Sequence, residues 1–244
     1  MRMIGLIGGM SWESTAVYYR RLNEQVRERF GGLHSAEILM RSVDFDAIVA
    51  LQKAGKWDEA ERVLCGIAQD LEKAGAACLL ICTNTMHKLA DQVAASVNVP
   101  LLHIADVTAR AGEDARPQPA TLPGTPHTMP QDFYLNRMRE RHGLDPIVPE
   151  ADDRTVVHDV IFDELCCGIV LDKSRQHYLD IIERGRASGA DSVILGCTEI
   201  GLLIGPEHTD LIVFDSTPLH ADAAVDFATS RDSSLVSGPA LASA

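Results

Sequence analysis

Short apolar runs alternate with longer amphipathic segments along nearly the whole chain. The runs that we interpret as buried strands are 3–7, 36–43, 77–81, 101–104, 192–195 and 211–214, with another short one at 147–148. The segments with the 3.6-residue period of helices are 13–29, 56–73, 85–96, 131–141, 153–166, 174–188 and 218–229. This alternation predicts an α/β fold in which helices cover parallel strands. Because the crossovers of such a sheet share one hand, the carboxyl ends of its strands lie at one edge.

A proline-rich stretch at 111–130 interrupts this alternation. We expect a first α/β lobe from residues 1–105, to which the last helix, 215–229, returns, and a second lobe from residues 106–214. Such packing holds two lobes together with a cleft between them. The final segment, 230–244, is rich in Ser, Ala and Gly and is predicted to be a flexible tail.

The composition is that of an ordinary globular protein and argues against several classes of partner. Of 244 residues, 46% are hydrophobic and 23% are charged, and the net charge is −13. Such a negative surface repels nucleic acids and anionic membranes, so we expect neither as a partner. No apolar run is long enough to span a bilayer, and the opening MRMIGLIGGM reads as a strand rather than a leader. The six cysteines contain no Cys-x-x-Cys pair, which favours reduced thiols and a cytoplasmic location.

Two short motifs follow predicted buried strands in different halves of the chain. They are CTNTMH at 82–87 and GCTE at 196–199, and each precedes a segment with helical character. Polar side chains at the carboxyl end of a parallel strand are where α/β proteins place ligands. Two such motifs suggest that two groups face one small substrate from opposite sides.

Cys197 is the candidate nucleophile or base of the second motif. At a strand-to-helix turn, the helix amino terminus would favour its thiolate, and Thr198 with the following backbone amides could hold a carboxylate. The competing interpretation is that Cys197 is a small apolar residue that fills the core.

The first motif offers hydroxyl and amide groups in Thr83, Asn84 and Thr85. They either cap a helix or bind the carboxylate and ammonium groups of an amino acid. Strand alternation predicts that Cys82 points away from the cleft. His87 falls within the predicted helix, and we interpret it as structural.

Other candidate sites are weaker. The loop after the first strand brings glycines close to the cleft, but Gly5-x-x-Gly8-Gly9 is not the dinucleotide fingerprint. Cysteine and histidine residues of the two motifs contain no closely spaced ligand pair, so we expect no metal.

Taken together, CTNTMH, GCTE and the opening LIGGMSWEST resemble the aspartate/glutamate racemase family of cofactor-independent amino-acid racemases. GGLHSA, SVDF, QDFY, PEAD and GCTEIGLL extend the resemblance to about residue 228. It implies two similar parallel-sheet lobes related by pseudo-two-fold symmetry, with the active site in the cleft between them. It also implies acidic amino-acid substrates, no cofactor or metal, and a possible homodimer.

The resemblance carries family roles onto individual positions. Cys197 matches the second catalytic cysteine, but the first is replaced by Thr83, because the commoner motif reads Cys-Asn-Thr. This pair resembles the subgroup of racemases for L-aspartate and L-glutamate, and it implies that the L-substrate is favoured. The residues that match substrate-binding positions or fall in ligand-facing loops are Met10, Ser11, Gln52, Asn84, Thr85, Thr125 and Thr198.

A second departure concerns the distal carboxylate of the substrate. Many relatives carry a lysine in the helix that reads FDELCCG here, and Cys166 or a neighbour replaces it. Recognition would then rest on neutral donors such as Gln52. Two alternatives stay open: a decarboxylase or cis–trans isomerase on the same scaffold, and a catalytically weak amino-acid-binding pseudo-enzyme.

Overall fold

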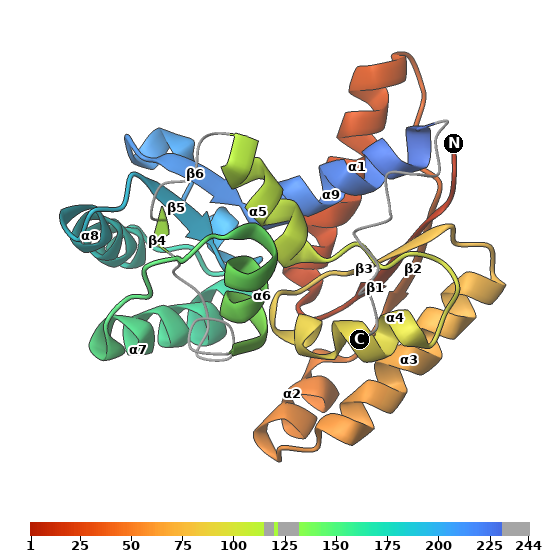
Figure 1. Cartoon of the computed structure of the whole chain (residues 1–244), viewed down its shortest axis with the longest axis horizontal. Coiled ribbons are helices and arrows are strands. Elements are labelled where there is room, and N and C mark those ends of the chain that lie inside the picture. The colour runs from red at the N-terminus through yellow and green to blue at the C-terminus, as the bar shows by residue number, and fades with distance from the viewer. Residues whose placement is uncertain (115–119, 122–131, 231–244) are drawn as a thin grey trace.

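The computed structural model describes residues 1–114, 120–121 and 132–230, which form two α/β lobes lying side by side (Figure 1). The first lobe contains a parallel sheet of β1 (Ile4–Gly8), β2 (Ile38–Ser42) and β3 (Cys78–Ile81) in the order β2-β1-β3. The second contains β4 (Ala120–Thr121), β5 (Ser192–Leu195) and β6 (Ile212–Asp215) in the order β4-β5-β6, also parallel. The predicted α/β class with two parallel sheets is confirmed.

Two isolated bridges reveal that the lobes share one topology. Leu101 pairs with Leu79 on the outer side of β3, and Ile147 pairs with Thr121 on the outer side of β4. When these positions are counted as strands, each sheet has the order 2-1-3-4 in chain sequence. The two lobes are therefore similar in design, in agreement with the expected pseudo-two-fold relation.

Helices cover both sheets, and none in the described part of the chain combines the length and apolarity needed to cross a membrane. Their bounds are α1 (Trp12–Phe30), α2 (Phe45–Lys53), α3 (Trp57–Lys73), α4 (Ala90–Ala95), α5 (Ile104–Asp114), α6 (Asp132–His142), α7 (Ala151–Asp159), α8 (Asp172–Ala187) and α9 (Ser216–Thr229). A 3-10 turn, Thr85–Leu89, leads into α4, and a π-helical segment, Val160–Glu164, continues α7 into a 3-10 turn at Leu165–Cys167.

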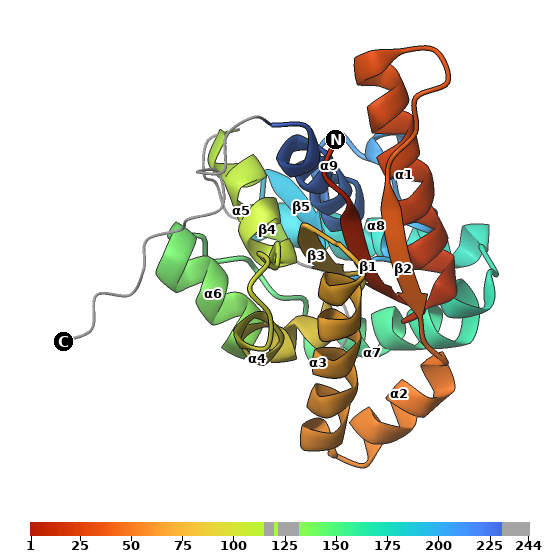
Figure 2. The same cartoon turned by 90° about the vertical axis from the view of Figure 1, so that its right-hand side faces the viewer.

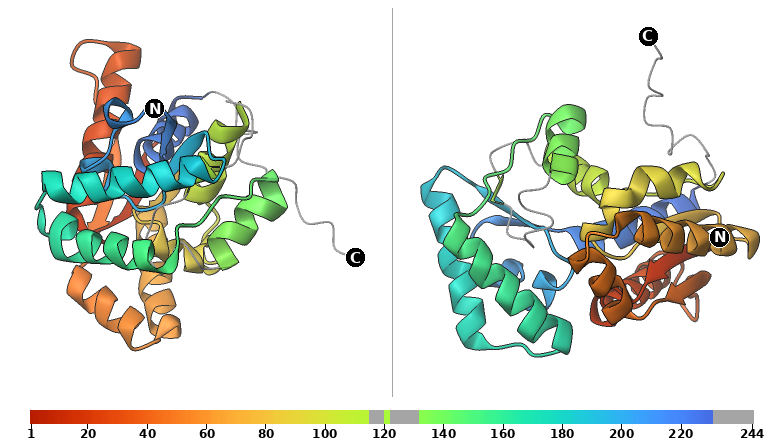
Figure 3. Two further views of the ribbon diagram at one scale, coloured as in Figure 1. Left: turned by 90° about the vertical axis from the view of Figure 1, so that its left-hand side faces the viewer. Right: turned by 90° about the horizontal axis from the view of Figure 1, so that it is seen from below.

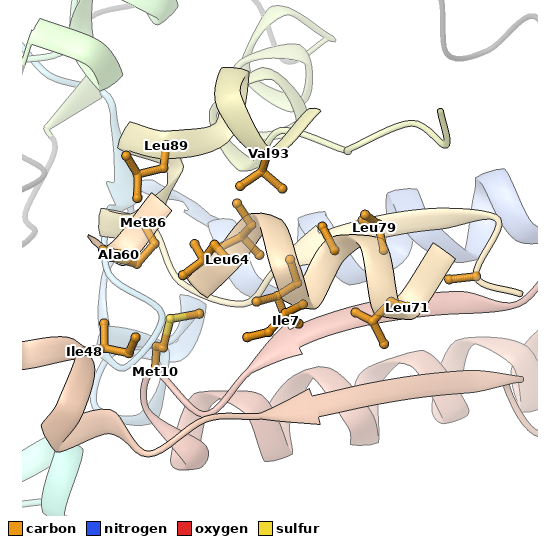
Figure 4. Packing of buried hydrophobic residues seen from close by; sticks show 14 residues of the cluster. Ile7, Met10, Ile48, Ala60, Leu64, Leu71, Leu79, Met86, Leu89 and Val93 are labelled. Carbon is orange, nitrogen blue, oxygen red and sulfur yellow. The ribbon is translucent and has the colours of Figure 1, made fainter. Parts of the chain in front are cut away.

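Strand alternation divides the first lobe into two hydrophobic layers. Ile7, Leu79 and Ile81 pack with α3 residues such as Leu64, a cluster shown in Figure 4. Cys82 belongs to the layer on the opposite face, where β1 and β3 meet α1 and α9 (Figure 2). Cys82 thus points away from the other motif residues, as its strand register predicted.

The second lobe repeats this arrangement. Val193 and Leu195 of β5 face α7 and α8, which lie together on the outside of the molecule (Figure 3). Ile194 faces α5 and α6 instead. The strands β1, β3 and β5 are therefore buried on both faces, which explains why they read as continuous apolar runs.

The secondary structure differs from the sequence prediction at four places. Helices α2 and α5 were not predicted, although Asp44 caps α2 by accepting a hydrogen bond from the Asp46 backbone at 3.3 Å. The predicted strand 101–104 is reduced to the bridge at Leu101, because α5 already begins at Ile104. The predicted helix 153–166 is not regular, since it changes to π-helical geometry at Val160.

Helix α9 follows β6 of the second sheet but packs on the core of the first lobe. His220 of α9 is fully buried there; its Nε2 donates to the Leu102 carbonyl at 2.8 Å, and its Nδ1 accepts from the Tyr18 hydroxyl at 2.8 Å. The lobe limits, including the assignment of 215–229 to the first lobe, stay a prediction. Most of the predicted tail, from residue 231, lies outside the described residues.

Acid should destabilise the fold through its buried histidines. Burial lowers the pKa of His220 to about 3 and that of His87 to about 4, whereas an unfolded histidine titrates near pH 6.5. Above pH 6.5 each neutral ring makes its full contribution to the free energy of unfolding. This contribution decreases as the pH falls toward the folded-state values, by about 2 kcal/mol per ring at pH 5. We expect the urea midpoint to fall between pH 7.5 and pH 5.

The His220→Asn variant should be less stable at pH 7.5 but should lose less stability on acidification than the wild type. His34→Asn, a change at an exposed position, should keep the wild-type dependence. An unchanged pH dependence in His220→Asn would show that this ring does not cause the acid sensitivity.

Candidate active site

The two motifs occupy equivalent positions in the two lobes. β3 and β5 are each the third strand of their sheet, and Thr83 and Cys197 each lie two residues beyond the last residue of that strand. Alternation places Thr83 on the side of Ile81 and Cys197 on the side of Leu195. The topology therefore places the Thr83 hydroxyl and the Cys197 thiol at corresponding positions of the two sheets.

Thr83 and Cys197 line one small cavity between the lobes. Their exposed fractions are 8% and 6%, and the cavity volume is about 20 Å³, roughly room for one water molecule. The residues that form its walls are Met10, Phe45, Gln52, Thr83, Thr85, Ile161, Phe162, Cys166, Cys197 and Glu199.

The remaining predicted site residues fall into three groups. Met10, Gln52 and Thr85 line the cavity together with the two motif residues. The buried polar residues Ser11, Asn84 and Thr198 lie behind its walls. Thr125 lies outside the described residues.

A glycine turn brings the loop after β1 to the cavity. Gly9 has φ of +89°, and a Cβ there would lie 2.4 Å from the backbone of Val43. Only glycine fits such a conformation and such a close approach. The turn is further fixed by Thr15, whose hydroxyl donates to the Ser11 carbonyl at 2.7 Å, so that the Ser11 side chain reaches the second lobe.

Glu199 is the centre of the polar network at this site, and the sequence analysis did not assign it a role. Its side chain is only 3% exposed. Oε1 accepts from the Ser11 hydroxyl at 2.8 Å, and Oε2 accepts from the Cys197 thiol and the Thr198 hydroxyl, both at 2.9 Å. A buried carboxylate is costly unless it is hydrogen-bonded, and these three donors meet that requirement. Its presence in GCTE was the only signal in the sequence.

The expectation that a helix amino terminus favours the Cys197 thiolate was wrong. The segment after it forms only a short 3-10 turn, Ile200–Leu202, instead of a long helix. Burial first, and then the negative charge of Glu199, raise the pKa of the Cys197 thiol well above its ordinary value. The thiol is therefore protonated at neutral pH and is hydrogen-bonded to an acceptor that can take its proton.

Asn84 connects the first motif to the other lobe. Its Nδ2 donates to Ser216 Oγ at 3.1 Å, and the Ser216 hydroxyl donates to the Leu195 carbonyl at the end of β5 at 2.8 Å. Asn84 Oδ1 is buried and has no hydrogen-bond partner among the described residues. An unsatisfied buried acceptor beside the cavity is suited to a cationic group of a ligand.

Part of the cavity wall is apolar. Phe45, Ile161 and Phe162 form it together with the Cys166 thiol, whose pKa is raised by burial. Gln52 adds an amide, which donates to Met86 Sδ at 2.9 Å. No lysine, arginine or histidine belongs to the described wall, consistent with the departure noted in the FDELCCG helix.

His87 supports the site from behind, as its structural interpretation predicted. It is 2% exposed; its Nδ1 donates to the Thr83 carbonyl at 2.7 Å, and its Nε2 accepts from the Ile104 backbone at 3.2 Å. Within the described ranges, no group of three or more His, Cys, Asp or Glu side chains could hold a metal ion.

Solved proteins that share this fold include Asp/Glu racemases. A solved Yersinia pestis protein assigned to the Asp/Glu racemases is 46% identical, with a TM-score of 0.87 over 94% of this chain and 100% of that one. An aspartate racemase homologue from Pyrococcus horikoshii is 34% identical, with a TM-score of 0.83 over the same shares. A broad-specificity amino-acid racemase of Bacillus subtilis is 21% identical over 228 residues, which are 91% of this chain and 96% of the relative.

The sequence model of the Asp/Glu/hydantoin racemase family matches residues 7–224, most of the chain and all of the site described above. The chain therefore belongs to the Asp/Glu/hydantoin racemase family and is, as the sequence predicted, an amino-acid racemase.

Proposed function

We propose that the protein racemises acidic amino acids without a cofactor, using Cys197 and Thr83 as the two proton-transfer groups. The observation that carries this proposal is that both side chains line one cavity from equivalent positions of the two lobes. Racemisation needs one group to remove the α-hydrogen and another to deliver a proton to the opposite face. A single pair of positioned side chains can do both.

Glu199 supplies the proton acceptor that the protonated Cys197 requires. The thiol hydrogen passes to Glu199 Oε2, 2.9 Å away, which leaves a thiolate and a neutral carboxylic acid. The thiolate then takes the α-hydrogen, and the electron pair of the broken C–H bond delocalises onto the substrate carboxylate. Thr83 donates its hydroxyl proton to the other face of the α-carbon and recovers one from solvent. Glu199 releases the proton it took from the thiol to solvent, which restores the starting state.

Polar groups around the cavity can hold the substrate during this transfer. Asn84 Oδ1, buried without a partner among the described residues, is the candidate acceptor for the α-ammonium group. Thr85 is a candidate for the α-carboxylate, as is the backbone of Thr198, whose hydroxyl already donates to Glu199. The resemblance adds Thr125, which lies outside the described residues. Donors to this carboxylate stabilise the negative charge that develops on it.

Acidic side chains are the substrate class that we propose from the resemblance and from the Asp/Glu racemase relatives. Gln52 is the candidate donor to the distal carboxylate because its amide lines the cavity. Met10 and Ser11 complete this side of the site. The Bacillus subtilis relative is named a broad-specificity enzyme, so the breadth of this one should be measured with a panel of amino acids.

We also propose a cytoplasmic homodimer. All six cysteines are free thiols, which fits a reducing compartment. The outer side of α1 exposes Trp12, Tyr19 and Phe30 at 63%, 53% and 52%, an apolar surface suited to a second copy.

The asymmetric pair predicts unequal rates for the two enantiomers. A thiolate is a far better base than a threonine hydroxyl, so the enantiomer whose α-hydrogen faces Cys197, expected to be L, should exchange faster. Loss of the α-proton signal of L- and D-aspartate in heavy water, followed by NMR, measures both rates. Thr83→Cys should raise the rate of the slower enantiomer.

Cys197→Ser should abolish exchange of both enantiomers, whereas Cys65→Ser, at a half-buried cysteine of α3, should leave it unchanged. Equal wild-type rates for L- and D-aspartate would contradict the asymmetric pair. Carbon dioxide release from an arylmalonate would instead support the decarboxylase alternative.

Glu199→Gln should slow exchange about 100-fold, the scale of one general base. Because the variant also removes a negative charge beside Cys197, the pKa of this thiol should fall. The pH at which iodoacetamide alkylates Cys197 should therefore shift downward. Glu183→Gln, an exposed change on α8, is the matched control. A Glu199→Gln variant with wild-type exchange and alkylation profiles would exclude Glu199 as the acceptor.

A further inference from the structure

A second pocket, separate from the cavity of Thr83 and Cys197, lies between α4 and α6. Figure 2 shows these two helices beside one another. Its volume is about 350 Å³, enough for a small metabolite. One side comes from the 3-10 turn and α4 of the first lobe, and the other from α6. Nothing in the proposed racemisation uses this pocket.

The pocket concentrates positive charge in a chain whose net charge is −13. Lys88, Arg137 and Arg141 line it, against the carboxylates of Asp91 and Glu140. Both of these acidic residues are exposed, and the Asp91 side chain at 85% can turn toward solvent. Because Arg137 is also paired with Asp106, the cations that a ligand could meet are Lys88 and Arg141.

The three cations are held differently. Arg137 is fixed by two hydrogen bonds to Asp106, at 2.6 and 2.7 Å, and its Nη1 lies 3.6 Å from Asp91. Lys88 lies over the ring of Trp57. Arg141 forms no hydrogen bond or ion pair with the residues that the structure describes, so its guanidinium is available to a ligand.

His103 adds a buried donor to the pocket wall. It is 7% exposed, and its Nδ1 accepts from the Ala105 backbone at 3.2 Å. The proton of the neutral ring is therefore on Nε2, which has no partner in the described part of the chain. A buried N–H beside arginine and lysine side chains is suited to an oxyanion.

We propose that this pocket binds a small molecule that carries a phosphate group, through Arg141, Lys88 and the Nε2–H of His103. Planar guanidinium groups and fixed N–H donors match phosphate oxygens, and the volume leaves room for a polar body beyond the phosphate.

The pocket is also connected to the catalytic loop. His87 lines it, and the ring of His87 lies 4.6 Å from that of His103, centroid to centroid. The same His87 donates to the carbonyl of Thr83 at 2.7 Å. A bound phosphate should therefore alter the position of Thr83 and change the racemisation rate, a consequence that rests on the proposed function.

Calorimetric titration at low ionic strength with inorganic phosphate, ribose 5-phosphate and succinate tests the binding without reference to activity. We expect both phosphates to bind, ribose 5-phosphate more tightly, and Arg141→Ala to weaken both about tenfold. Arg139→Ala should have no effect, because this neighbouring arginine of α6 pairs with Asp145 and does not line the pocket. His103→Phe should weaken binding while keeping the ring volume.

Three results would overturn the phosphate site: no binding heat with either phosphate, tighter binding of succinate than of both phosphates, or equal losses in Arg141→Ala and Arg139→Ala. Saturating phosphate should change the α-proton exchange rate of the wild type but not that of Arg141→Ala. Binding without this change would refute the link to Thr83 and leave the site itself intact.

Discussion

The burial of the Glu199 carboxylate is the constraint on which the site depends. A charge at 3% exposure is tolerated only with strong hydrogen bonds, and its donors come from both lobes: Ser11 from the first, Cys197 and Thr198 from the second. The same carboxylate therefore joins the lobes and, together with burial, keeps the Cys197 thiol protonated. A change at Glu199 would affect both the contact between the lobes and the pKa of Cys197.

The repeated 2-1-3-4 strand order explains how a two-sided site arises from one chain. A polar side chain follows each third strand two residues beyond its end, and these two side chains line one cavity between the lobes. Helix α9 reinforces this packing because it leaves the second sheet and lies on the first, where His220 fixes it to α1. The symmetry is one of position rather than chemistry, since one lobe presents Thr83 and the other Cys197.

Strand bounds and side-chain register depend on neighbouring residues, and local patterns in the sequence predicted them. The bounds of β5 match the predicted run, and the register of β3 predicted that Cys82 lies in the core. Long-range contacts were not predictable in this way. The role of Glu199 depends on Ser11, which is 188 residues away in sequence, and the pKa of Cys197 depends on the resulting burial. The helix α5 was missed because its apolar start reads equally well as a strand.

The tightness of the cavity between Thr83 and Cys197 has a kinetic consequence. A space of about 20 Å³ cannot admit an amino acid, so the cavity must open for a substrate to enter and for a product to leave. When the cavity is closed, a carbanion would meet almost no bulk water, which limits its capture on the wrong face and its breakdown by side reactions. In the proposed mechanism Thr83 recovers its proton from solvent, so each opening would permit one inversion and opening would limit the turnover number.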